Sequence, residues 1–170
     1  MVPRILNLML AVTLLLVETA VRAVAQAPTA TLSNGTYQLC SQPPPQNWQQ
    51  GAGVCLVARK QNDRIDGYYG YPHSDAFVCL RGILQGTEVT GTGYFISWQG
   101  NHRDTVPSQP FFWDEEERLQ LDQAQVIQSD AQPPIAWVMF QKATLDLTSF
   151  QLYREAQMTP PQQLCDWNFH

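Results

Sequence analysis

Short apolar and aromatic runs alternate with brief polar segments between residues 53 and 98. Val, Ile, Tyr and Phe dominate the runs, while Asn, Asp, Ser and Gly separate them, which is typical of strands joined by tight turns. No window of this stretch has the apolar spacing of an amphipathic helix. The pattern predicts an antiparallel meander whose strands occupy residues 54–60, 65–71, 77–84 and 89–98.

Glycines interrupt the second and the fourth of these strands, at Gly67, Gly70, Gly91 and Gly93. Glycine in a strand interior weakens the strand unless the backbone bends sharply or approaches another group closely. Its repetition on alternate strands favours strong curvature, as in a sheet that closes into a barrel. We therefore predict an all-β fold, an up-and-down antiparallel meander of about seven or eight strands that is barrel-like or strongly curved.

The rest of the chain has a weaker strand pattern. The acidic run at residues 114–117 would suit the first turn of a helix, but Leu119 and Leu121 alternate as in a strand, which favours a turn and a short strand. Further strands are predicted at residues 36–40, 135–141, 144–147 and 150–153. No linker or low-complexity tract divides residues 26–170, so we expect a single β-domain there.

Residues 1–25 have the features of a secretory signal peptide. Arg4 supplies a positive charge, residues 5–17 are almost wholly apolar, and residues 23–25 place small side chains where signal peptidase requires them. The apolar run is shorter than the roughly 20 residues that a membrane-spanning helix needs, and an uncleaved anchor is the alternative. We expect export to the periplasm or the extracellular space, with no membrane span in the mature chain.

The formal net charge of −5 narrows the range of partners. Nucleic acids and anionic lipid surfaces reward clusters of Lys and Arg, so this acidic chain is not expected to bind either. The partners that remain are a small molecule or a component of the cell envelope.

The cysteines lie at positions 40, 55, 79 and 165, and an even number in an exported chain predicts two disulfides. No pair has the CxxC spacing of a structural zinc site. Within the predicted meander, Cys55 and Cys79 lie opposite Tyr69 on either side of its strand, about 10 Å apart, which is too far for a disulfide. We therefore favour Cys40–Cys55, which closes the Pro-rich loop between the first two strands, and Cys79–Cys165, which attaches the C-terminal segment to the sheet.

Two polar loops carry residue types that perform catalysis in other proteins: His73 and Asp75 in one, His102 and Asp104 in the other. Adjacent residues of one loop cannot converge as a Ser-His-Asp triad, and turn hydrogen bonds explain the first loop without any chemistry. If both loops met at one end of the sheet, these residues could serve an envelope-polymer hydrolase or a metal site. Solvated loops are the simpler interpretation, so we assign no catalytic residue, metal or cofactor.

The aromatic residues of the predicted sheet suggest a binding role. Tyr69, Tyr71, Tyr94 and Trp98 fall on or beside its strands. A barrel interior lined by Tyr and Trp with few charges can hold a small apolar or planar ligand. The alternative is that these rings fill the interior themselves.

One stretch resembles a known group of proteins. Residues 66–82, followed by residues 88–91 and more faintly by residues 143–147, resemble uncharacterised exported proteins of cyanobacteria. The resemblance implies export and a small all-β domain, and it brings no activity or site residues. We predict an exported non-enzymatic β-domain that binds a small apolar or aromatic ligand or an envelope component. The alternatives are the envelope-polymer hydrolase and a structural or partner-binding domain that uses a sheet edge.

Overall fold

The computed structural model describes residues 32–97, 106–131 and 134–169. Within these residues it contains β-strands and two 3₁₀ helices, Trp48–Gln50 and Pro161–Gln163, and no α-helix, which confirms the predicted all-β class. None of the helices in this part of the chain has the length and apolar character needed to cross a bilayer. Residues 1–25, where the signal peptide is predicted, lie outside the described residues.

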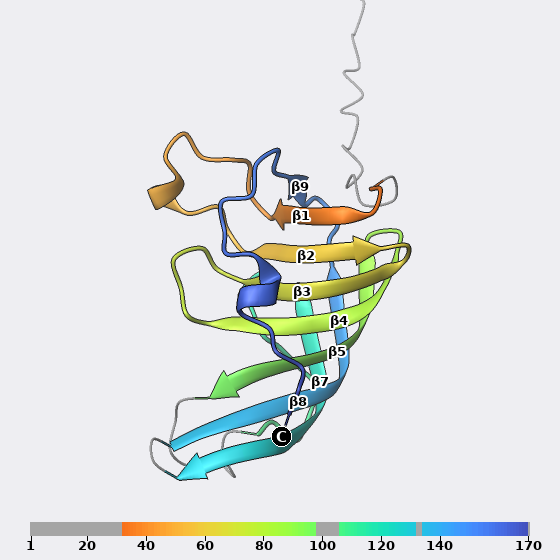
Figure 1. The fold of residues 1–170 in the computed structure, drawn as a ribbon, viewed down its shortest axis with the longest axis vertical. Coiled ribbons are helices and arrows are strands. Elements are labelled where there is room, and N and C mark those ends of the chain that lie inside the picture. The colour runs from red at the N-terminus through yellow and green to blue at the C-terminus, as the bar shows by residue number, and fades with distance from the viewer. Residues whose placement is uncertain (1–31, 98–105, 132–133, 170) are drawn as a thin grey trace, which may run out of the picture.

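All strands belong to one antiparallel sheet with the order β6-β7-β8-β5-β4-β3-β2-β1-β9 (Figure 1). Their bounds are β1 Gly35–Cys40, β2 Cys55–Gln61, β3 Arg64–Gly70, β4 Phe77–Gln85, β5 Glu88–Ser97, β6 Phe111–Phe112, β7 Leu119–Ala131, β8 Pro134–Asp146 and β9 Gln151–Leu152. Strands β1 to β5 form the predicted meander, and β8 then pairs with β5. The sheet curves strongly into a half-barrel of nine strands.

The second half of the sheet differs from the prediction in two details. The strands predicted at residues 135–141 and 144–147 are one strand, β8, and β7 is longer than the short strand expected there. Gln141 and Lys142 are both exposed, and the chain stays in the sheet past them through a bulge opposite Thr92, between Gly91 and Gly93 of β5. Strand β9 lies within the strand predicted at residues 150–153, strand β6 was not predicted, and each has two residues.

The strand glycines allow the sheet to bend, as predicted. A Cβ atom on Gly67 would lie 2.2 Å from the carbonyl oxygen of Val57, and one on Gly91 would lie 2.0 Å from that of Arg81. The neighbouring strand therefore approaches too closely for any side chain at these two positions. Tight approach at β3 and again at β5 matches the strong curvature of the sheet.

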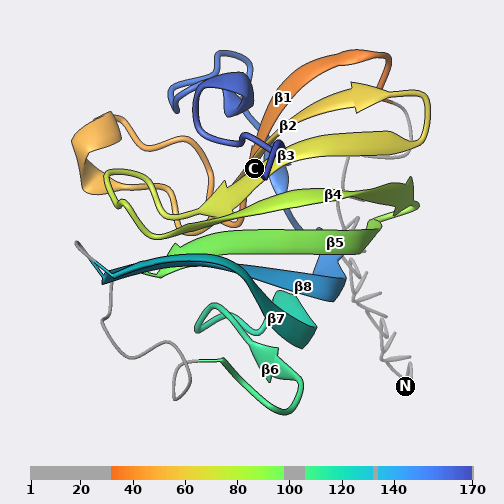
Figure 2. The same ribbon diagram turned by 60° about the horizontal axis from the view of Figure 1, so that its bottom comes forward.

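The inner face of the curved sheet is filled by its own side chains. Its largest fully buried members include Leu56, Tyr69, Leu80, Leu119, Phe140, Leu145 and Phe150. Residues 106–118, the segment before β7, cross the open side of the curved sheet (Figure 2). We call them the crossing segment, and their Val106, Phe111 and Trp113 side chains pack against this core. These side chains form a packed core on the inner face of the sheet.

Asp114 holds this crossing segment in shape. Its side chain is 4 % exposed, and its carboxylate accepts backbone N–H bonds from Glu116, Arg118 and Leu119 at 3.1, 3.2 and 2.8 Å. The predicted turn at residues 114–117 is present, and Glu116 accepts a 2.8 Å bond from the Ser41 hydroxyl just after β1. The first residue of the acidic run is therefore a buried acceptor of backbone hydrogen bonds.

The outer face of the same sheet is covered by the C-terminal tail, residues 154–169, which runs across β2 to β5 (Figure 1). Val57, Tyr68, Cys79 and Tyr94 are buried there beneath tail residues such as Met158, Leu164, Trp167 and Phe169. The hydroxyls of Tyr68 and Tyr94 donate to the backbone oxygens of Thr159 and Asp166 at 2.8 and 2.7 Å. The outer face thus has its own buried apolar cluster beneath the tail.

Two disulfides join Cys40 to Cys55 and Cys79 to Cys165, the pairing expected from the sequence. The register differs by one residue from the prediction, because Cys55 lies opposite Gly70 and Cys79 opposite Tyr68, not both opposite Tyr69. The first disulfide joins directly opposed residues of β1 and β2, and the second attaches the tail to β4. The strand order that excludes a Cys55–Cys79 bond is correct.

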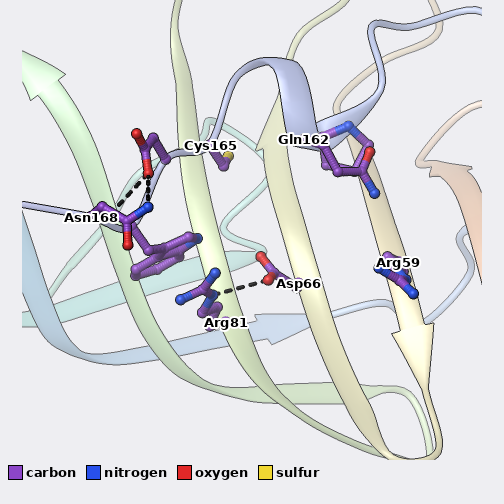
Figure 3. A pocket seen from close by; sticks show the side chains of 9 residues that line it. Arg59, Asp66, Arg81, Gln162, Cys165 and Asn168 are labelled. Carbon is purple, nitrogen blue, oxygen red and sulfur yellow. Dashed lines mark hydrogen bonds and ion pairs between the residues drawn. The ribbon is translucent and has the colours of Figure 1, made fainter.

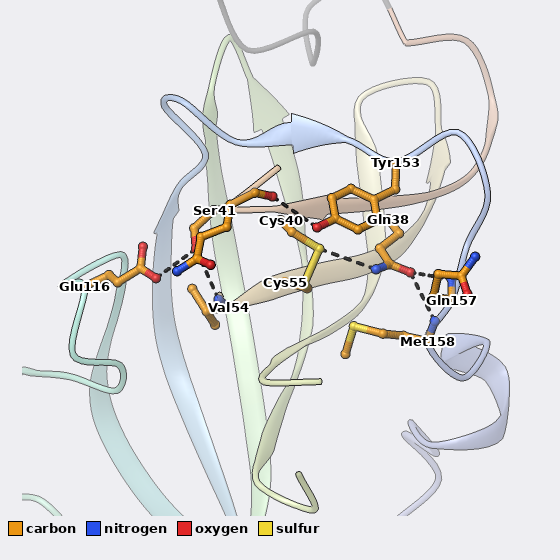
Figure 4. Close-up of a disulfide and its surroundings, with 10 residues drawn as sticks. Gln38, Cys40, Ser41, Val54, Cys55, Glu116, Tyr153, Gln157 and Met158 are labelled. Carbon is orange, nitrogen blue, oxygen red and sulfur yellow. Dashed lines mark hydrogen bonds between the residues drawn. A yellow bond between two sulfur atoms is a disulfide. The ribbon is translucent and has the colours of Figure 1, made fainter. Parts of the chain in front are cut away.

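Gln38 attaches the beginning of the tail beside the first disulfide (Figure 4). Its side chain is buried, and its Oε1 accepts bonds from the backbone N–H groups of Gln157 and Met158 at 2.7 and 3.1 Å. Its Nε2 lies 3.4 Å from the sulfur of Cys40. Both ends of the tail are therefore fixed to the outer face, one by an amide and the other by a disulfide.

Candidate functional site

Those of the predicted interior aromatic residues that the structure describes are divided between the two faces of the sheet. Tyr69 is buried in the inner core, and Tyr71 lies half-buried beside it, stacked on Trp113 with ring centroids 6.1 Å apart. Tyr94 is on the outer face under the tail, and Trp98 lies outside the described residues. Rings therefore pack the inner face where an open interior was considered, and any ligand must bind at the surface of this part of the chain.

Only one of the two loops of the hydrolase alternative lies within the described residues. His73 and Asp75 lie on the loop between β3 and β4, whereas His102 and Asp104 fall outside the described residues. The Nε2 atom of His73 lies 3.0 Å from the backbone oxygen of Trp48, and the two rings meet edge to face. In the part of the chain that the structure describes, no cluster of three His, Cys, Asp or Glu side chains could hold a metal ion.

An open aromatic cleft lies at the end of the sheet where β4 begins and β5 ends. Its volume is about 400 Å³, and its lining consists of Asp75, Ala76, Phe77, Phe95, Ile96, Ser97 and Trp113. Three separate segments contribute to it: the β3–β4 loop with the start of β4, the end of β5, and the crossing segment before β7. We call this group of residues the aromatic cleft.

The core holds the walls of the aromatic cleft in place. Trp113 contacts Tyr69 at 5.7 Å and Tyr71 at 6.1 Å between ring centroids, and Phe95 stacks on Phe140 at 5.6 Å. Because these supporting rings belong to or border the packed inner face, the cleft rings have little freedom to collapse into the opening. The cleft is therefore shaped before any ligand arrives.

The charge differs between Tyr71, which supports the aromatic cleft from behind Trp113, and Asp75 at its rim. Burial raises the pKa of the Tyr71 hydroxyl, and the negative charges of Asp114, Glu115 and Glu116 raise it further. Tyr71 behind Trp113 is therefore neutral at ordinary pH. The charged residue in the lining is Asp75, an exposed side chain at the rim, and Ser97 is the other polar side chain.

A second cleft lies between the outer face and the tail (Figure 3). Its volume is about 260 Å³, and Arg59, Asp66, Arg81, Pro161, Gln162, Cys165, Asp166, Trp167 and Asn168 line it. Arg59, Asp66 and Arg81 come from the neighbouring strands β2, β3 and β4, and the other residues belong to the tail. We call these residues the polar cleft.

Most residues that line the two clefts were not predicted from the sequence. Trp113 reaches the aromatic cleft through a crossing segment that no strand pattern reveals, and Asp166 to Asn168 reach the polar cleft because Cys165 attaches the tail. The predicted disulfide was the one signal that could have placed the tail on the outer face of β4. Among the predicted catalytic and ligand-binding residues that the structure describes, Asp75 alone lines one of the two clefts.

No family model, no curated protein and no solved structure matches this chain. The resemblance to exported cyanobacterial proteins stays a prediction. A curved antiparallel sheet serves many unrelated purposes, so the fold by itself carries no activity. The two clefts are the features from which a function can be inferred.

Proposed function

We propose that this chain is an exported binding module that takes a small planar aromatic ligand in the aromatic cleft. The observation that supports this is the convergence of Phe77, Phe95 and Trp113 from three segments around a space of about 400 Å³. Cavities of this size, lined by apolar and aromatic side chains with few polar groups, are typical of small-molecule sites. A flat ring can stack on aromatic walls of this kind or meet them edge to face.

The rim favours a ligand with a positive charge or a hydrogen-bond donor. Asp75 is the charged residue that lines the aromatic cleft, and Ser97 adds a hydroxyl on the opposite strand end. A carboxylate beside aromatic faces attracts a cationic group both by charge and through the negative ring faces. The net charge of −5 acts in the same direction at longer range. The expected ligand is a small aromatic amine.

The test is binding of tryptamine to the oxidised protein, measured by native mass spectrometry and titration calorimetry. Indole, which lacks the amine, and cyclohexylamine, which lacks the aromatic plane, should each bind more weakly. Replacing Phe77→Ala or Asp75→Asn should weaken tryptamine binding about tenfold, as expected for loss of a ring contact or of a charge-assisted hydrogen bond.

The matched controls are Phe112→Ala and Asp63→Asn. Phe112 is 47 % exposed beside the crossing segment, and Asp63 lies in the β2–β3 turn, and neither lines the aromatic cleft. Both variants should bind tryptamine like the unchanged protein. Equal loss in the controls, or no binding by tryptamine and a panel of other planar amines, would exclude this function.

A further inference from the structure

Charged side chains cross three strands in a row on the floor of the polar cleft. Arg59 lies directly opposite Asp66, and Asp66 directly opposite Arg81. Asp66 forms its ion pair with Arg81, whose Nε lies 3.0 Å from Oδ2, and Arg59 makes no ion pair with any described residue (Figure 3). The row therefore leaves one guanidinium with all of its donors available.

Arg81 is held in a fixed orientation. Its Nε is used by Asp66, and its Cζ lies 4.5 Å from the centre of the Trp167 ring, within the range of a cation–π contact. The tail thus packs over one side of the guanidinium. No hydrogen bond from its terminal nitrogens to the described residues competes with a ligand. Two arginines with free donors therefore face the same small space.

The tail supplies further polar groups from the opposite side. Asn168 donates from its backbone N and its Nδ2 to one oxygen of Asp166, at 3.0 and 2.9 Å, which fixes this turn of the tail. Gln162 adds a second amide to the lining. The indole N–H of Trp167 is fully buried without a hydrogen-bond partner in the described structure, so it can report on the cleft without itself contacting a ligand. A ligand with several oxygens would find donors from both the strands and the tail.

We propose that the polar cleft binds a small hydroxylated monocarboxylate of the uronic acid type. A carboxylate matches the planar fork of an arginine, and amide side chains suit hydroxyl groups. Asp66 and Asp166 in the same lining disfavour a dianion such as phosphate. At roughly 30 Å³ per water molecule, the volume of about 260 Å³ equals about nine waters, which suits a single sugar unit.

The test is titration of the oxidised protein with D-glucuronate, followed by NMR through the indole N–H resonance of Trp167. The Trp167→Phe variant identifies this resonance. Glucuronate should shift it in a saturable way, and Arg59→Gln should weaken binding at least tenfold through loss of charge-assisted hydrogen bonds. Arg64→Gln removes the same charge from an exposed position of β3 outside the polar cleft and should change binding less than twofold.

Three control ligands test separate features of the proposed ligand. Glucose lacks the carboxylate, acetate lacks the hydroxyl groups, and phosphate is the disfavoured dianion. All three should bind at least tenfold more weakly than glucuronate. Equal binding of glucose, equal binding of phosphate, no shift with glucuronate, or equal loss in Arg59→Gln and Arg64→Gln would each overturn the proposal. Tryptamine binding should be unchanged in Arg59→Gln, and glucuronate binding unchanged in Asp75→Asn, so the two proposed sites stand or fall separately.

Discussion

Both faces of this sheet carry a buried apolar cluster, but the two clusters are covered in different ways. Strands from both ends of the sheet and the crossing segment pack together on the inner face, so each side chain there is held by many others. The outer face is covered by one irregular tail, fixed by the Cys79–Cys165 disulfide, by Gln38 and by two tyrosine hydroxyls. The inner cover depends on the whole sheet, and the outer cover depends on a few identifiable bonds.

This difference explains where the clefts lie. The inner face is filled by its own strands, and the aromatic cleft lies at its end, where β4 begins and β5 ends. A face covered by an irregular tail leaves space beneath the cover, where charged residues of the strands meet amides of the tail. The chemistry of each cleft follows from the way its face is closed.

Removing the Cys79–Cys165 disulfide should have a large effect, and one that frees the outer cover. The bond spans 86 residues, and replacing both cysteines by alanine should lower the free energy of unfolding by about 4 kcal/mol. Urea denaturation measures this loss, and limited proteolysis should cut the tail while the sheet stays protected. The control is the Cys40→Ala/Cys55→Ala variant, which removes the disulfide that spans 15 residues. Its tail should stay protected from the protease. A tail that stays protected in both variants would contradict the inference that the Cys79–Cys165 disulfide holds the outer cover in place.

A cavity on the inner face should affect the whole sheet. Phe140 is fully buried between Phe95 and Phe111, and Phe140→Ala should cost about 3–5 kcal/mol of unfolding free energy. Phe112→Ala, one position along from Phe111 but 47 % exposed, should cost less than about 1 kcal/mol. Both values come from urea denaturation. Hydrogen exchange in Phe140→Ala should rise in every strand, and a rise confined to β8 would contradict the cooperative inner core.

Alkaline pH should weaken the outer face by a smaller amount. Burial raises the pKa of Tyr68 and of Tyr94 to about 12 from the ordinary value of 10.0. Between these two values the unfolded chain releases protons that the folded protein keeps, so stability is complete below pH 10 and falls as pH rises towards 12.

The Tyr68→Phe/Tyr94→Phe variant tests this titration. Its stability should fall less steeply between pH 10 and 12 than that of the unchanged protein, although it loses two hydrogen bonds to the tail at neutral pH. The remaining slope belongs in part to Tyr69 on the inner face, whose pKa is raised by burial and by Asp114. Tyr37→Phe, with a hydroxyl bonded only to exposed Ser33, is the control. An unchanged slope in the double variant would contradict the prediction.

The sequence was informative where side chains alternate locally. Strands β2 to β5, the glycine bends and the disulfide pairing follow from patterns within a few residues or from simple strand spacing. The single strand β8 did not follow, because Gln141 and Lys142 break the alternation at a bulge that only its neighbour β5 reveals. Local periodicity cannot report a pairing between strands that are distant in the sequence.

The clefts were predictable only in part for the same reason. Asp75 was singled out by its residue type, but Trp113 and Asn168 lie on segments without regular structure. Their positions result from Asp114, which bonds three backbone N–H groups, and from Cys165, which attaches the tail. The sequence shows such residues but not the distant partners that position them.

The pairing of β5 with β8 divides the sheet into two pieces during folding. Strands β1 to β5 can zip together in order, and β6 to β8 form a second local unit, so each piece can arise before the two meet. Until that encounter β5 and β8 present long edges without partners, which are templates for association with other chains. We expect the joining of these two edges to limit the folding rate and to be the moment at which the protein is most exposed to aggregation.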